Sequence, residues 1–260
     1  MKKINKIVIG ILVVFYVLFG VVITVFQEKV VYHPDNQSFV NCPAFKDVKK
    51  VEVNGTRMYV KDTTKPVFVL YHGNAGSACD RSLYADIFTQ SNYGYIIVEY
   101  AGYSNDKVKP SHELIKKDVR NVISYLDDNK ITDVVVVGES IGTGVASHHV
   151  SQKPPEKLIL LSPFTSLADI ASNTFWFYPT SWMVNNAFDN VKALQDFKGG
   201  GILIIHGNND AVIPYKLGLK LFESIDHKNK LVTIKGGGHN DLFTYKETYS
   251  TITDFINGVK

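Results

Sequence analysis

Four consecutive valines at residues 134–137 run directly into the pentapeptide Gly-Glu-Ser-Ile-Gly at 138–142. Four β-branched residues in a row are typical of a strand that is buried on both faces. The pentapeptide fits Gly-x-Ser-x-Gly, the pattern of a nucleophile held on a sharp turn between a strand and a helix. A larger side chain at either glycine would crowd so tight a turn. The pattern predicts that Ser140 is a nucleophile lifted out of the sheet.

The pentapeptide alone is a weak signal, because a chain with 19 glycines can contain it by chance. The alternative is a strand end punctuated by glycines, with a serine that only faces solvent. The context favours the nucleophile, since a strand precedes the pattern and residues 143–150 can continue as a helix.

A serine hydroxyl needs a base to become a good nucleophile, and the base needs an acid to orient it. In this architecture the order along the chain is serine, acid, histidine. Asp210 stands in a turn after the apolar strand expected at 201–206. His239 stands in a glycine-rich loop at 236–241, after another expected strand. The order predicts a triad of Ser140, Asp210 and His239.

The chain contains other acids and histidines that could take these roles. Asp189 and Asp241 are the alternative acids, although each also fits a turn aspartate that bonds its own backbone. His239 alone among the histidines follows a strand downstream of both Ser140 and Asp210, and its alternative role is to stabilise a loop. The remaining histidines are expected at the surface (His33, His112, His227), at strand ends (His72, His206) or on different faces of one helix (His148, His149), which argues against a shared metal.

A tetrahedral intermediate needs hydrogen-bond donors for its oxyanion. The first expected donor is the backbone N–H of Ile141, directly after the nucleophile. The second is expected from the loop at 72–76 (His-Gly-Asn-Ala-Gly), which follows a strand at 67–71. We expect the N–H of Asn74 there, with Ala75 as the near alternative. A plain glycine turn that opens a helix would explain the same loop without a ligand.

Together, these motifs resemble the α/β-hydrolase superfamily from about Val51 to the C-terminal end. The segments at 138–144, 162–167 and 206–210 are similar to those of a small single-domain subgroup. Members of that subgroup often carry an N-terminal membrane anchor, and some are thioesterases that remove palmitoyl groups from proteins. The resemblance implies the same triad. The chain departs from the subgroup at Glu99 and Ala101, where Asp and Arg are usual, and at the glycines 199–201, where a proline is usual.

Residues 7–26 form an apolar run without a charge, long enough to cross a hydrocarbon core of about 30 Å. A cleaved signal peptide would have a shorter apolar core and a small-x-small site; a buried core helix is the third alternative. Lys2, Lys3 and Lys6 precede the run, and this bias predicts a cytoplasmic N-terminus at 1–6. A connector at 27–46 and a hydrolase domain at 47–260 would then lie on the non-cytoplasmic side.

Composition excludes several other functions. The net charge of +3 is small and not gathered into a basic stripe, so nucleic acid is an unexpected partner. Phosphate-binding and dinucleotide-binding glycine motifs do not occur, and no metal or other cofactor is expected. Cys42 and Cys79 do not suggest a zinc site. An exported domain could pair them, but the sequence leaves open whether they are close enough.

The expected fold is α/β: a mostly parallel, twisted sheet with helices on both faces, an N-terminal antiparallel hairpin and one preceding transmembrane helix. The hairpin turns at Asn54-Gly55, a strong turn signal. Strands are expected at 67–71, 95–100, 133–138, 157–161, 201–206 and 230–235, and helices at 77–89, 111–129, 141–151, 215–224 and 244–257.

A lid would have to come from residues 163–200, which leave room only for a short cap over a rather open site. This segment could form a wall for an acyl chain beside Ser140, or simply pack on the sheet. Its large apolar side chains are Phe164, Phe175, Trp176, Phe177, Tyr178, Trp182, Met183 and Phe188.

The sequence therefore predicts a membrane-anchored serine hydrolase that cleaves esters or thioesters of acyl chains, small or lipid-linked, without a cofactor. A peptidase or amidase could use the same triad. A non-catalytic, membrane-tethered interaction protein could use the same fold. Labelling of Ser140 by a fluorophosphonate would discriminate the enzymes from the interaction protein.

Overall fold

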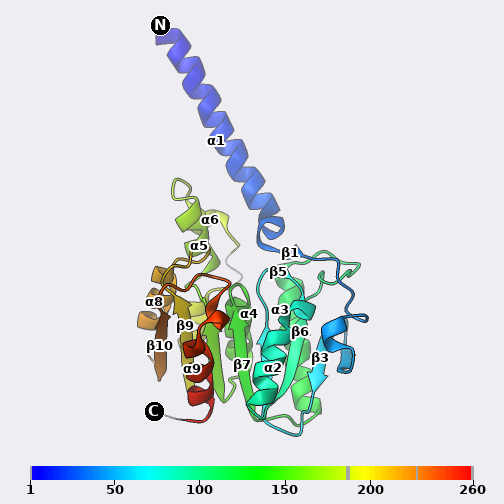
Figure 1. Ribbon diagram of the computed structural model, residues 1–260. Coiled ribbons are helices and arrows are strands. Elements are labelled where there is room, and N and C mark those ends of the chain that lie inside the picture. Colours follow the sequence, from blue (N-terminus) through cyan, green and yellow to red (C-terminus); the bar gives the residue numbers. More distant parts are fainter. Residues whose placement is uncertain (1, 186–187, 227, 259–260) are drawn as a thin grey trace.

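The computed structural model describes residues 2–185, 188–226 and 228–258, with side chains from residue 6 onward. An eight-stranded sheet lies between two layers of helices, and the long helix α1 (Lys2–Val31) projects from one end of this body (Figure 1). The cap helices α5 (Leu167–Thr174) and α6 (Thr180–Met183) stand at the same end.

The sheet has the strand order β10-β9-β8-β7-β4-β6-β3-β2. All neighbours are parallel except β2 with β3 and β3 with β6, so the predicted parallel sheet with an antiparallel hairpin is confirmed. Each predicted strand is present within one residue of its expected bounds. The strands are β2 (Lys49–Val53), β3 (Thr56–Lys61), β4 (Val67–Tyr71), β6 (Gly94–Glu99), β7 (Val134–Glu139), β8 (Lys157–Leu161), β9 (Gly201–Gly207) and β10 (Asn229–Ile234).

Helices cover both faces of the sheet, and each face has its own apolar core. Ile115 of α3 (His112–Asp128) and Val145 of α4 (Gly142–Gln152) belong to one core, together with α8 (Tyr215–Ser224). The other core takes residues from α2 (Ser82–Gln90) and α9 (Lys246–Ile256). The predicted helix at 77–89 begins instead with a 3₁₀ turn (Ala78–Arg81) before α2.

Two small features were absent from the sequence-based prediction. A two-residue strand β1 (His33–Pro34) pairs in parallel with β5 (Ala75–Gly76). The cap contains three short helices, α5, α6 and α7 (Asn190–Leu194).

The parallel register brings distant loops to one edge of the sheet. Tyr71 at the end of β4 lies opposite Gly138 of β7. The loops that follow β4, β7, β9 and β10 carry Asn74, Ser140, Asp210 and His239, so all four meet at the carboxyl edge, where ligands bind in open α/β sheets.

Helix α1 fits a single-pass membrane anchor. Its segment Lys6–Val31 has 26 residues, and its most apolar 18-residue window has a mean hydropathy of 3.0 with only 6% buried. This is sufficient by length and composition to cross a bilayer. The helix is interrupted at Phe26, where φ is −104° and ψ is 15°. The interruption falls on the last residue of the predicted apolar run.

The base of α1 is docked on the domain. The Asn74 side-chain amide donates to the carbonyl of Val31 (3.0 Å), and a carboxylate oxygen of Glu28 accepts the N–H of His112 (3.0 Å). Tyr32 covers the imidazole of His112, with 2.6 Å between the hydroxyl and Nδ1. The prediction of His112 at the surface is therefore wrong, because the base of α1 buries the first turn of α3. His227 lies outside the described residues.

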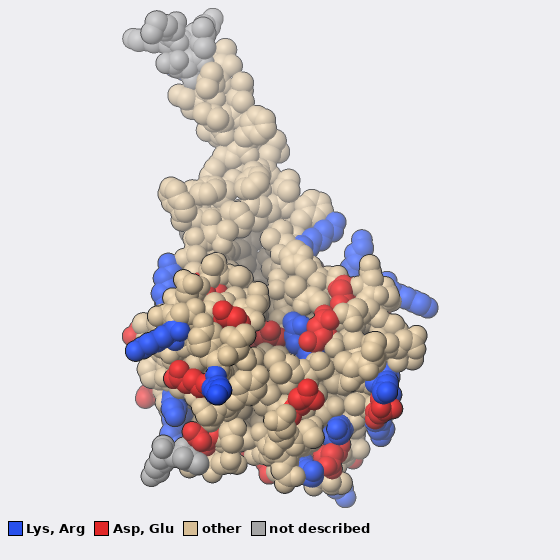
Figure 2. Space-filling view, in the orientation of Figure 1, with Lys and Arg blue, Asp and Glu red and all other residues tan. Residues whose placement is uncertain are grey.

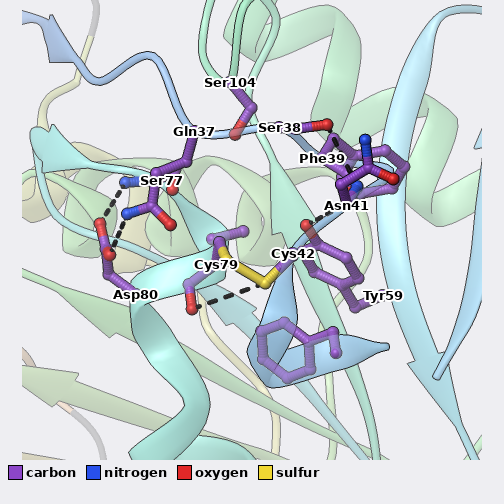
Figure 3. Close-up of a disulfide and its surroundings, with 12 residues drawn as sticks. Gln37, Ser38, Phe39, Asn41, Cys42, Tyr59, Ser77, Cys79, Asp80 and Ser104 are labelled. Carbon is purple, nitrogen blue, oxygen red and sulfur yellow. Dashed lines mark hydrogen bonds between the residues drawn. A yellow bond between two sulfur atoms is a disulfide. The ribbon is translucent and has the colours of Figure 1, made fainter. Parts of the chain in front are cut away.

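The connector is fixed to the body by a disulfide between Cys42 and Cys79 (Figure 3), which answers the pairing question that the sequence leaves open. Two aromatic rings of the connector, Phe39 and Phe45, pack on Tyr59 with centroids 4.6 and 4.4 Å away. The connector is therefore part of the folded body.

We expect replacement of both cysteines by serine to lower the free energy of unfolding by about 4 kcal/mol, since the bridge closes a loop with a sequence separation of 37. For a chain of this size the midpoint of thermal unfolding should fall by roughly 10 °C. Calorimetry of the detergent-solubilised protein measures this. Reductant should bring the wild type to the level of the double variant. Equal midpoints for both proteins without reductant would contradict the expectation.

Candidate active site

Ser140 sits at the apex of a strained elbow between β7 and α4. Its φ is +55°, a left-handed conformation that residues with a side chain seldom adopt. A Cβ on Gly138 would lie 2.6 Å from the carbonyl oxygen of Gly142, and one on Gly142 would lie 2.1 Å from that of Tyr71. Both glycines are therefore required by space, as the sequence predicts.

The structure brings Ser140, His239 and Asp210 into one hydrogen-bonded chain. The Ser140 hydroxyl lies 2.9 Å from Nε2 of His239, and Nδ1 of the same ring lies 2.7 Å from Oδ2 of Asp210. Ser140 and Asp210 are both buried. A neutral imidazole that donates from Nδ1 to the carboxylate leaves Nε2 free to accept the serine proton.

Asp210 is held as a carboxylate by several donors. Its Oδ1 accepts the backbone N–H groups of Val212 (2.9 Å) and Ile213 (2.8 Å). Burial by itself would raise the pKa of Asp210, but hydrogen bonds from His206 and His239 and from the N–H of Ile213 outweigh it and hold that pKa well below its usual range. The acid therefore stays charged beside His239.

His206 is a residue of this site that sequence reasoning assigned to strand-end packing or loop hydrogen bonding. It is fully buried, its Nε2 lies 2.9 Å from the carbonyl oxygen of Ile213, and the same nitrogen lies 3.3 Å from Oδ2 of Asp210. Its place just before the turn that carries the acid was visible in the sequence. The approach of its ring to the carboxylate was not, because it depends on how the turn folds back.

The alternative acids serve local turns. Asp189 caps α7 by accepting the N–H of Lys192 (3.0 Å), and Asp241 accepts the N–H of Gly238 (2.7 Å) in the loop that carries His239. Within the described residues, no group of three or more His, Cys, Asp or Glu side chains could hold a metal ion.

The two expected oxyanion donors, Asn74 and Ile141, line the same pocket as Ser140. Across the part of the chain described here, neither backbone N–H has a hydrogen-bond partner in the protein. The alternative residue, Ala75, pairs with His33 in the small parallel ladder and does not line this pocket.

The loop that carries Asn74 is held from three directions. The carbonyl oxygen of Asn74 accepts hydrogen bonds from the Tyr103 hydroxyl (2.7 Å) and from the N–H of His33 (3.0 Å). The side chain of Asn74 donates to the last residue of α1. On the other side of the loop, Arg81 forms an ion pair with Oε2 of Glu139 (2.8 Å). The N–H of Gly73 donates to the same oxygen of Glu139. Sequence reasoning did not find this pair, since its members are far apart in the chain.

The pocket above Ser140 has a volume of about 290 Å³ and a largely apolar lining. Parts of its wall come from the base of α1, from the cap and from the loop after β9, and Asn74, His112 and Ile141 complete the lining beside Ser140. The site is thus less open than the sequence predicts, because the anchor helix closes one side. Its apolar lining includes Ile23, Val30 and Val31 of α1, Leu167, Ile170, Phe175, Tyr178, Met183 and Val184 of the cap, and Val212 and Ile213.

The cap is an aromatic wall only in part. Phe175 and Tyr178 line the pocket, whereas Phe164 and Phe188 are buried against α4. Trp176 and Trp182 do neither, and their exposed fractions are 80% and 88%. Two of these aromatic residues therefore line the pocket and two pack on the body, while the role of the pocket wall in holding an acyl chain stays a prediction.

Comparison with known proteins was consistent with this geometry. The chain is 28% identical over 235 residues to the lysophosphatidylserine lipase ABHD12 of Xenopus tropicalis, covering 77% of this chain and 60% of that protein. It is 27% identical over 202 residues to the alpha/beta hydrolase domain-containing protein 17B of Xenopus laevis, covering 75% and 67%. The esterase EaEST of Exiguobacterium antarcticum shares the fold, with a TM-score of 0.62 and 19% identity over 81% and 99% of the two chains. No protein-family profile matches the sequence.

We expect Asp210→Asn to cost about 2 kcal/mol of stability at neutral pH, because an amide cannot accept from Val212, Ile213 and His239 together. The pKa of Asp210 is lowered in the folded state, so its contribution is full above the unfolded pKa of about 4 and is lost as the pH falls through the lower folded value. Denaturant unfolding of both proteins between pH 3 and 7 measures the difference. If the difference in unfolding free energy between the two proteins widened below pH 4, the stabilising role of the Asp210 carboxylate would be contradicted.

Proposed function

We propose that this chain, a hydrolase of the α/β-hydrolase superfamily, cleaves carboxylic ester or thioester bonds of acyl chains with Ser140 as its nucleophile. One observation carries the proposal: an unbroken hydrogen-bonded chain from Ser140 through His239 to Asp210 ends at a largely apolar pocket. An apolar pocket with few polar groups suits an acyl chain, whose burial contributes about 0.8 kcal/mol for each methylene.

The reaction starts with attack of Ser140 Oγ on the acyl carbonyl carbon. Nε2 of His239, 2.9 Å away, takes the hydroxyl proton as the new C–O bond forms. Asp210 fixes the tautomer of the ring and stabilises the imidazolium through Nδ1. His239 then gives the proton to the leaving alcohol or thiol, and an acyl-enzyme on Ser140 remains.

The tetrahedral oxyanion would be held by the N–H groups of Ile141 and Asn74. Each such donor typically contributes about 3 kcal/mol to transition-state stabilisation. Water, activated by His239, attacks the acyl-enzyme in the second half of the reaction and releases the acid. None of these steps calls for a cofactor.

The substrate proposed is an acyl ester or thioester that is presented at the membrane surface. The pocket lies at the base of α1, and residues of that helix line it. The relative named lysophosphatidylserine lipase supports a lipid-derived ester, since its name describes hydrolysis of a lipid with an acyl chain.

We expect Ser140→Ala to abolish labelling by a fluorophosphonate and to lower kcat on p-nitrophenyl acyl esters by at least about 10³-fold. The reason is that the Ser140 hydroxyl is the one placed against the proposed base, 2.9 Å from Nε2 of His239. Gel fluorescence and a spectrophotometric assay on the detergent-solubilised full chain measure the two effects. Persistent labelling of the alanine variant would place the reactive group elsewhere.

A series of acyl-chain lengths on the same leaving group is the control for substrate class. Turnover should rise from acetate to medium and long chains as the pocket fills. Equal or faster turnover of short polar amides would contradict an acyl-ester function and favour an amidase.

We further propose that residues 1–6 are cytoplasmic, that 7–26 span the membrane, and that the connector 27–46 and the domain 47–260 lie on the other side. Lys2, Lys3 and Lys6 support this direction through the positive-inside bias. The disulfide between Cys42 and Cys79 supports it as well, because disulfides persist in oxidising compartments.

In sealed cells we expect a membrane-impermeant maleimide to label Val108→Cys, an exposed position on the domain, and to leave Lys3→Cys unlabelled. Permeabilised cells should show both labels, which controls for thiol reactivity. The reverse pattern in sealed cells would invert the topology.

A further inference from the structure

The tip of the cap has the composition of a membrane-embedded segment. Residues 170–188 contain no Asp, Glu, Lys, Arg or His. The two tryptophans of the whole chain, Trp176 and Trp182, both lie on this tip and expose 80% and 88% of their surface. Figure 2 shows the uncharged surface of α1 continuing onto the adjoining end of the domain, whereas charged residues cover the body below. Exposed apolar surface that adjoins a membrane helix marks contact with lipid.

The cap tip is fastened to the middle of α1. The rings of Tyr16 and Tyr178 stack with centroids 4.3 Å apart. The Tyr16 hydroxyl donates to the carbonyl of Phe177, and the Tyr178 hydroxyl donates to that of Tyr16, both at 2.7 Å. Gly20 permits this approach, because a Cβ there would lie only 3.0 Å from the ring of Tyr178.

These contacts fix the depth of the tip. With a rise of about 1.5 Å per residue, Tyr16 lies roughly 15 Å from Phe26 and about as far from the start of the apolar run. A hydrocarbon core of about 30 Å that contains residues 7–26 therefore has Tyr16 near its centre. The carbonyl of Phe177 and the side chain of Tyr178, which are hydrogen-bonded to Tyr16, must then lie inside the same core.

Several backbone N–H groups of the tip are satisfied within the protein, as a location inside the hydrocarbon core favours. The N–H groups of Tyr178 and Trp182 donate to the carbonyls of Phe175 and Pro179. Those of Thr180 and Val184 donate to carbonyls of the tip as well. Pro179 has no N–H to satisfy.

An apolar groove lies between the tip and the pocket above Ser140. It has a volume of about 350 Å³ and lies between α1 and the cap, with Val17, Val21 and Pro179 in its lining. Thr24, Tyr178 and Met183 line both this groove and the pocket above Ser140, so the two spaces adjoin. A lipid tail in the groove would point its carbonyl end toward Ser140.

We propose that the cap tip at 175–183 is a second membrane-embedded element, and that the groove beside α1 admits the acyl chain of a membrane-resident lipid ester directly from the bilayer. The embedding of the tip stands on contacts and composition alone. The entry of the substrate rests on the proposed function.

Intrinsic fluorescence tests the embedding without any activity, since both tryptophans lie on the tip. The full chain is reconstituted into phosphatidylcholine vesicles with or without brominated acyl chains, and iodide is added from the water. Trp176→Phe and Trp182→Phe assign the signal to each ring. Quenching by brominated chains with protection from iodide is expected for both. Full quenching by iodide and none by brominated lipid would overturn the proposal.

Gly20→Leu tests the groove, because its larger side chain must push Tyr178 and Met183 away from α1. Gly10→Leu is the matched control, since no atom lies within 4 Å of a Cβ at Gly10. We expect Gly20→Leu to lower the ratio of two turnover rates, that of a long-chain ester in vesicles to that of a soluble butyrate ester, by about tenfold. A change of this size is typical of a small misfit in an apolar site. The control should keep the wild-type ratio.

An unchanged ratio in Gly20→Leu would overturn entry through the groove. If the wild type itself neither hydrolysed the butyrate ester nor was labelled at Ser140, the proposed function would be refuted instead. The two failures are thus distinguishable, and the fluorescence result is independent of both.

Discussion

The close contact between the start of α4 and the end of β4 is the constraint on which the site depends. The backbone of Gly142 approaches the Tyr71 carbonyl so closely that no side chain fits between them. This contact forces the chain to turn sharply after β7, which puts Ser140 in a conformation with positive φ. It also brings the loop after β4 beside the serine. Ser140 and the N–H of Asn74 thus share one edge of the sheet because of a single steric requirement.

The anchor helix is a structural part of the site as well as a tether. Its last turn is held by the amide of Asn74 and by the first turn of α3, and its side chains complete the wall of the pocket. The backbone group expected to hold the oxyanion therefore belongs to a residue that also grips the membrane helix. The proposed catalytic geometry and the proposed membrane anchor are thus joined at Asn74, so removal of α1 would expose the pocket and release the loop.

The sequence predicted most of what depends on local chemistry. The valine-rich strand at 134–137 and the Asn54-Gly55 turn have signals within a few residues, and the structure has both. The grouping of Ser140, Asp210 and His239 was predictable because a parallel sheet brings the ends of its strands together. The order of the motifs along the chain, each after an expected strand, carried that information.

What sequence reasoning missed depends on contacts between distant segments. The burial of His112 is caused by Tyr32, 80 residues earlier, and no local pattern announces it. The same applies to the approach of His206 to Asp210. The cap helices are short and lack a long apolar period, so tertiary packing sets their bounds. No local pattern announces the contact between Gly20 and Tyr178 either.

The bridge between Cys42 and Cys79 has a consequence for shedding from the membrane. It joins the anchored side of the connector to the body across the hairpin and β4. A protease that cut the chain anywhere between these cysteines would produce two fragments that stay covalently linked. The enzyme could then be nicked and still remain tethered, and release into solution would require either reduction or a cut before residue 42.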